Sequence, residues 1–250
     1  MQVNCTQCGG LIEVGEGELF LTCPFCSSAV YVDKRKVVFH YVLASTLSEE
    51  DAEKALKRWM AGNDTAKGLE EKSKISATDF YYFPIWYFKV RKNGEERVMT
   101  ELAASTPIVD LKDIQIPAGD LRFYEPSEFE GQTFRDPEML YDAALAWLKK
   151  KGASAEDVLE SALVHIPVYQ MKYEYNGGSY SAAVEGSSGR VYAAVFPAKS
   201  EVPFYAVAAI AFILFLGEGI LIGSLGTRLL AYGLTAVPLI LLATLISETV

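Results

Sequence analysis

The sequence has little of the material from which most enzyme active sites are built. Its 250 residues include only two histidines, His40 and His165. Neither stands beside a serine, cysteine or carboxylate motif. A lone histidine in an apolar strand is more often a packed structural residue than a catalytic base. A glycine-rich phosphate loop and a metalloprotease helix are also missing. We therefore expect a protein that is not an enzyme, with a catalytic site invisible in the sequence as an alternative.

The N-terminus lacks the basic segment and apolar run of a cleavable signal peptide, because it begins Met-Gln-Val-Asn-Cys. The cysteines are therefore expected in a reducing compartment, where thiols bind metal rather than form disulfides. Basic charge is scarce as well. Residues 1–200 hold 29 acidic and 22 basic residues, a net charge of −7. That balance repels phosphate backbones and argues against nucleic acid as a partner.

All four cysteines fall into two Cys-x-x-Cys pairs. Cys5 and Cys8 form the first, Cys23 and Cys26 form the second, and 14 residues separate them. Paired spacing with no cysteine left over is typical of a zinc site. Four thiolates fill the coordination sphere of zinc, so we expect one structural Zn2+ per chain with no open position for catalysis. The alternative is a set of redox-active or structural cysteines without metal.

The residues around these pairs predict a zinc ribbon over residues 1–35. Leu11–Val14 and Leu19–Thr22 are short apolar segments that we expect to pair as a hairpin. Gly9 permits the positive φ needed after the first pair, whereas Ser27 takes that place after the second. The segment resembles rubredoxin-like and transcription-factor-type zinc ribbons. The resemblance implies a fold and not a function, because such ribbons occur in nucleic-acid binders and protein adaptors alike.

The following region predicts two α+β repeats with antiparallel sheets, one in residues 36–125 and one in residues 126–200. An ungapped alignment of Pro84 with Pro167 places Asn93-Gly94 on Asn176-Gly177, and Asn-Gly is a strong hairpin signal. In the second copy, residues 169–175 alternate as a half-buried strand. A third strand is expected from Val191 to Phe196.

A helix is expected before the sheet of each repeat. Ser48 should cap the first, and Asp136 followed by Pro137 should begin the second. Both helices contain Ala-x-x-x-Trp, which predicts that Trp59 and Trp147 occupy equivalent buried places. The remaining core-facing positions of the two helices are expected to be Ala52, Ala55, Leu56 and Met60, and Leu140, Ala144 and Leu148.

The stretch from Ile166 to Val191 is similar to a family of poorly characterised prokaryotic zinc-ribbon proteins, many of them membrane-anchored. In that family a proline-led aromatic strand leads to a Gly-x-Thr-Gly turn, and here Ser188 takes the place of the threonine. The resemblance implies an accessory membrane protein and no known reaction. The densest aromatic run, residues 80–88, is expected to be a core strand, with an exposed docking surface as the alternative.

Residues 201–250 predict a transmembrane helical hairpin. Phe204–Gly223 and Leu229–Ile246 are each long and apolar enough to cross about 30 Å of hydrocarbon. The short segment between them forces an antiparallel arrangement, with both chain ends on the cytoplasmic side. Glu218 is the only charge in the first span. We expect its carboxylate to extend to the nearby interface, with an intramembrane function as the alternative.

The sequence thus favours a membrane-anchored accessory or adaptor protein that binds a cytoplasmic or membrane protein. The second partner that the sequence predicts for the protein is the lipid bilayer. A membrane-bound thiol or zinc sensor is one alternative. A nucleic-acid-binding ribbon is another, and the acidic balance opposes it.

Overall fold

The computed structural model describes residues 1–34, 36–107, 111, 114, 116, 121–200 and 202–249, the last four without their side chains. It has the mixed α+β architecture and the two C-terminal apolar helices that the sequence predicts. The chain forms two compact units. One combines Met1–Lys57 with Lys74–Val195, and the other combines Arg58–Ser73 with Phe196–Val250.

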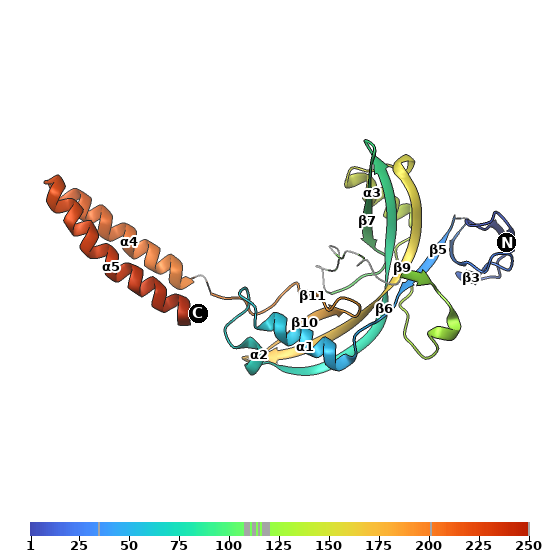
Figure 1. The fold of residues 1–250 in the computed structure, drawn as a ribbon, viewed down its shortest axis with the longest axis horizontal. Coiled ribbons are helices and arrows are strands. Elements are labelled where there is room, and N and C mark those ends of the chain that lie inside the picture. Colours follow the sequence, from blue (N-terminus) through green and yellow to red (C-terminus); the bar gives the residue numbers. More distant parts are fainter. Residues whose placement is uncertain are drawn as a thin grey trace. The chain divides into compact units, whose positions relative to one another are not determined.

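The larger unit is built on two long antiparallel strands, β6 (Lys74–Lys92) and β9 (Val158–Tyr175), which curve together in Figure 1. The pairing runs along nearly the whole of both strands, with a register irregularity near each end. Asn93 and Asn176 have φ angles of 55° and 48° and begin tight turns. These turns lead into the return strands, so both predicted Asn-Gly hairpins are confirmed.

The other strands extend this sheet outward from β9 and β6. On one edge of β9, β5 (Lys36–Leu43) runs parallel to its first half, and β10 pairs with its second half. The third strand of the second repeat is shorter than predicted and contains only Val191 and Tyr192. The remaining strands of the nine-stranded sheet are β3 (Phe20–Thr22), β4 (Ala29–Asp33), β7 (Glu95–Leu102), β8 (Leu121–Phe123), β10 (Gly178–Glu185) and β11 (Val191–Tyr192).

Both faces of β6 are covered at its middle. Every side chain from Tyr81 to Trp86 is buried, and so is Phe88. Phe83 and Ile85 belong to one apolar cluster and Trp86 and Phe88 to another, as the two-residue repeat of a strand requires. The expectation that this aromatic run is a core strand is confirmed, and its buried rings are inaccessible to a docking partner.

The helix α1 (Glu49–Met60) begins where the sequence predicts. The backbone N–H of Asp51 donates to the Ser48 hydroxyl at 3.2 Å, as an N-cap should. The helix α3 (Tyr141–Lys150) starts four residues after Pro137, so the predicted start at Asp136 is wrong. Its first N–H, from Tyr141, donates instead to the buried Asp33 carboxylate at the end of β4, at 2.6 Å. The remaining helical segments are α2 (Leu69–Lys72) and the 3-10 turns Pro126–Glu128 and Ala155–Asp157.

The late start of α3 also changes which of its side chains face the core. Tyr141, Ala144 and Leu148 are buried, as a helical repeat from residue 141 requires. Trp147 is therefore turned outward and is 47% exposed, with the Lys150 ammonium over its ring. Leu140 is also exposed. Trp59 is partly buried in the smaller unit against Phe196. The prediction of equivalent buried tryptophans is wrong.

The smaller unit contains α4 (Val202–Leu221) and α5 (Leu225–Thr249), which are long and apolar enough to cross a membrane. A three-residue connection makes them antiparallel neighbours. Arg228 lies inside the first turn of α5 rather than in the connection, and its Nε donates to the Ile222 carbonyl at 2.9 Å. That bond satisfies a carbonyl just past the C-terminal end of α4.

Glu218 does not extend to the nearby interface as predicted. Its Oε1 accepts a hydrogen bond from the Thr235 hydroxyl at 2.6 Å, across the two helices. Thr235 lies ten residues into α5, about 15 Å along that helix from its start. The bond therefore directs the carboxyl toward the middle of the hairpin. Its Oε2 is buried and has no hydrogen-bond partner among the described residues.

The cap on α3 supplies a stability test with a matched control. Replacement of Asp33 with alanine should lower the free energy of unfolding by about 1 kcal/mol, because the Tyr141 N–H loses its acceptor. Asp136→Ala, at the start predicted from the sequence, should change it by less than about 0.5 kcal/mol. Urea unfolding of both variants measures this, and equal losses would contradict the assigned cap.

Candidate metal centre

The first cysteine pair lies in a tight turn between two short strands. β1 (Gln2–Asn4) enters the turn and β2 (Leu11–Glu13) leaves it, and the two strands pair with each other. The Cys5 N–H donates to the Gly10 carbonyl at 2.8 Å, and the Gly9 N–H donates back to the Cys5 carbonyl at 2.9 Å. Gly9 has a φ of 73°, as predicted.

The second pair repeats this geometry. The Cys23 N–H donates to the Ser28 carbonyl, and the Ser27 N–H donates to the Cys23 carbonyl, both at 2.9 Å. Ser27 adopts a φ of 59° although it has a side chain. Here β3 enters the turn and β4 leaves it. The predicted hairpin between Leu11–Val14 and Leu19–Thr22 is wrong. Each cysteine turn closes a hairpin of its own, because β2 pairs with β1 and β3 pairs with β4.

The two turns bring the four sulfurs together. All four Sγ atoms lie within 4.8 Å of one another. Cys5 Sγ is 3.7 Å from Cys26 Sγ, and Cys8 Sγ is 3.7 Å from Cys23 Sγ. Zn–S bonds of about 2.3 Å in a tetrahedron place sulfurs about 3.8 Å apart. The predicted ligands therefore form a cluster that can hold a metal ion, and its dimensions and donors fit zinc.

The cluster has a buried side and an open side. Cys5 and Cys23 are buried beside an apolar cluster that includes Ile12 and Val30, whereas Cys8 is exposed. On the open side the Gly10 N–H donates to Cys8 Sγ at 3.4 Å. The Ser28 hydroxyl, 3.3 Å from Cys26 Sγ, and the Ser28 N–H lower the pKa of the Cys26 thiol to about 6. The thiolate is the form that binds metal, and Ser28 favours it at Cys26. At Cys8 the Gly10 N–H also favours it, but desolvation and the neighbouring thiols together raise the pKa to about 12.

The ribbon is joined to the sheet through β4 and β5, and the ring of Phe20 reaches the two histidines. His165 Nε2 lies 2.9 Å from the Arg135 carbonyl and so must donate to it. His165 Nδ1 is then an acceptor, and it lies 2.9 Å from His40 Nε2. This leaves His40 Nδ1 unprotonated, buried and without a partner among the described residues.

The pairing of these histidines was not predicted, because 125 residues separate them and each lies in an apolar segment. Burial lowers the pKa of His165 to about 4. Burial, together with the charge of His165, lowers the pKa of His40 well below its ordinary value. The rings of Phe20, Tyr124 and Phe134 pack around the pair. The arrangement is that of a buried neutral pair within the core.

Comparison with known proteins supplies no relative for this arrangement, since no protein-family model, curated protein or solved structure matches the chain. The four cysteine sulfurs and the two apolar helices fit a zinc-ribbon-like membrane protein on their own geometry.

Elemental analysis tests the metal centre. Purified full-length protein should contain one zinc per chain, and replacement of Cys23 and Cys26 with serine should abolish it, because two of four ligands are lost. Ser27→Gly, which keeps all ligands and removes the side chain at a positive φ, should retain full zinc content. Protein without zinc, or with disulfides between these cysteines, would contradict the assignment.

The histidine pair predicts a pH dependence of stability. Well above pH 6.5 the imidazoles are neutral in both the folded and the unfolded chain, and the contribution of the pair to stability is complete. Between about pH 6.5 and 4 the unfolded chain binds protons that the folded chain does not bind. The free energy of unfolding should therefore fall by about 3 kcal/mol over this range for His165 alone. Urea unfolding from pH 7 to 5 should show a shallower decline in His165→Leu than in the wild type. Parallel declines would contradict this account.

Proposed function

We propose that this protein is a membrane-anchored adaptor whose zinc ribbon binds another protein on the cytoplasmic face. The observation that carries the proposal is a set of exposed apolar side chains on the ribbon. Phe25 is 68% exposed, Leu11 50% and Leu19 40%. Exposed aromatic and aliphatic groups on a rigid element are typical of protein-binding surfaces.

Phe25 is held in place by the metal-binding turns. It lies between Cys23 and Cys26, and its ring covers Gly10 of the other turn. A Cβ atom added at Gly10 would come within 2.5 Å of the Phe25 ring. One structural zinc ion would fix both turns and therefore this contact. An anchoring side chain fixed before binding loses less conformational entropy when a partner arrives.

The sheet behind the ribbon would serve as a platform for this surface. Its strand pairing fits the predicted duplication, whereas the different surroundings of Trp59 and Trp147 do not. In each half of the larger unit, a helix precedes a long strand, an Asn-Gly turn and a return strand. The ungapped alignment equates Phe83 with Ile166, and these two residues are also direct partners in the β6–β9 pairing. A local two-fold axis through this pair would exchange the two repeats.

The hairpin of α4 and α5 would anchor the protein by crossing the membrane twice. The three-residue connection leaves little mass on the far side, so the partner must be met at the near face or within the membrane. A reducing environment for the thiolates favours the cytoplasm as the near side. Glu218, bonded to Thr235 within the hairpin, adds a polar contact between the helices.

A membrane-bound thiol sensor is the second candidate, and one observation favours it. Cys8 is exposed, so the open side of the cluster is accessible to oxidants, and Ser28 lowers the pKa of the Cys26 thiol to about 6, which favours its reactive thiolate. In that case mild peroxide should release zinc and change partner binding reversibly. An adaptor should bind its partner equally well under reducing and mildly oxidising conditions.

The adaptor proposal is tested by cross-linking at defined positions in native membranes. A photoreactive amino acid at Phe25 should give one major protein adduct, and Phe25→Ser should reduce capture of the same protein at least about fivefold. Val98 on β7 is 52% exposed and serves as the matched control, where substitution should change nothing. Equal capture by both variants, or turnover of a small molecule by the purified protein, would contradict the proposal.

A further inference from the structure

The segment that precedes the first apolar helix is held against the loop after α1. Thr65 and Ala198 form an isolated antiparallel bridge. The Ala66 N–H donates to the Pro197 carbonyl at 2.7 Å, and the Lys199 N–H donates to the Asp64 carbonyl at 3.2 Å. We call residues 61–68 and 196–200 the juxtamembrane collar. All of it belongs to the smaller unit.

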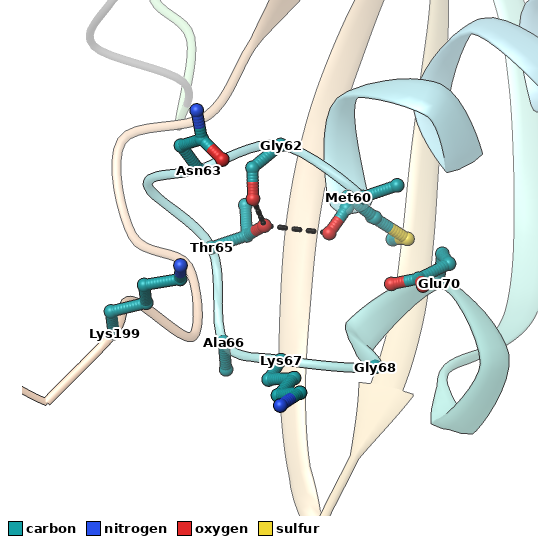
Figure 2. Close-up of a pocket in the computed structure, with 10 residues that line it drawn as sticks. Met60, Gly62, Asn63, Thr65, Ala66, Lys67, Gly68, Glu70 and Lys199 are labelled. Carbon is teal, nitrogen blue, oxygen red and sulfur yellow. Dashed lines mark hydrogen bonds between the residues drawn. The ribbon is translucent and has the colours of Figure 1, made fainter. Parts of the chain in front are cut away.

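The loop half of the collar is fixed from within. The Thr65 side chain is 2% exposed, and its hydroxyl lies 2.6 Å from the Met60 carbonyl and 2.9 Å from the Gly62 carbonyl. Figure 2 shows these bonds closing the loop at the end of α1. Gly68, with a φ of 70°, turns the chain into α2. The loop half of the collar is therefore held by its own hydrogen bonds.

Two pockets of opposite character meet in the collar. One has a volume of about 530 Å3 and a mainly polar lining that includes Thr65, Glu70 and Lys199. The other has a volume of about 700 Å3, and its lining includes Phe196, Phe204 and Tyr205 together with Asp64. Asn63 and Lys199 line both pockets. An amphipathic ligand could place a charged group in the first and an apolar group in the second.

Lys199 lies where these pockets join, three residues before α4 begins. In Figure 2 its ammonium is directed toward Thr65, whereas that of Lys67 is directed away from the loop. Lys199 forms no ion pair with any carboxylate of the described residues, which do not include Glu201. Phe204 and Tyr205 lie in the first turn of α4, where aromatic side chains favour the interface of a bilayer.

We propose that the juxtamembrane collar binds one phospholipid of the leaflet that α4 enters, with the phosphodiester on Lys199 and the glycerol and upper acyl carbons along Phe204 and Tyr205. This inference rests on the membrane anchoring in the proposed function. The Lys199 ammonium supplies the positive charge that binds a phosphate, and the aromatic pocket supplies the apolar surface that an acyl chain covers. The lipid would orient the collar at the membrane surface.

The test uses the full-length protein in detergent micelles, delipidated and titrated with short-chain phosphatidylethanolamine, with bound lipid counted by native mass spectrometry. The wild type should bind one phospholipid per chain, and short-chain diacylglycerol, which lacks the phosphate, should bind at least about tenfold more weakly. Lys199→Gln should lose about tenfold in phospholipid affinity. Lys199→Arg and Lys67→Gln should bind as the wild type does.

Equal binding of the phospholipid and diacylglycerol, or equal losses in Lys199→Gln and Lys67→Gln, would overturn the site. Resistance of the wild type to carbonate extraction from native membranes tests the anchor separately. If the wild-type protein stays in the membrane but phospholipid binding does not depend on Lys199, the collar site alone is overturned. A wild-type protein released by carbonate overturns the anchoring and, with it, the site.

Discussion

The antiparallel pairing of β6 with β9 is the interaction on which the larger unit depends. The second edge of β9 pairs with β5 and β10, and the second edge of β6 pairs with β7. The remaining strands of this sheet are attached through β5 and β10. β5 in turn carries β4, and β4 carries the second cysteine turn. The second cysteine turn of the candidate metal centre is therefore joined to the core through the main-chain pairing of β4 with β5.

The same arrangement places the histidine pair where the ribbon joins the sheet. His40 lies on β5 and His165 on β9, and Phe20 packs against both from the ribbon. A charged imidazole here would have no counter-ion among the residues that the structure describes and would lose its hydration, which is why burial depresses both pKa values. Protonation of either imidazole is therefore expected to weaken the packing at this junction.

Local signals predicted the elements better than their partners. The two Asn-Gly turns, the cap at Ser48 and the four clustered cysteines each depend on a few adjacent residues, and each was found from the sequence. The start of α3 was missed because its first N–H is satisfied by Asp33, more than a hundred residues away. The histidine pair was missed for the same reason. Side chains that meet only through the sheet leave no periodic pattern in one sequence.

The proposed function requires one arrangement in the cell: the cysteine cluster and the sheet on the cytoplasmic face, with only the short connection of the hairpin beyond the membrane. Reporter fusions measure this directly. A reporter active only in the cytoplasm should be active at residue 1 and after residue 250, and inactive when inserted between Ile222 and Leu225. Activity on opposite sides for the two ends, or activity of both ends only outside the cytoplasm, would contradict the account.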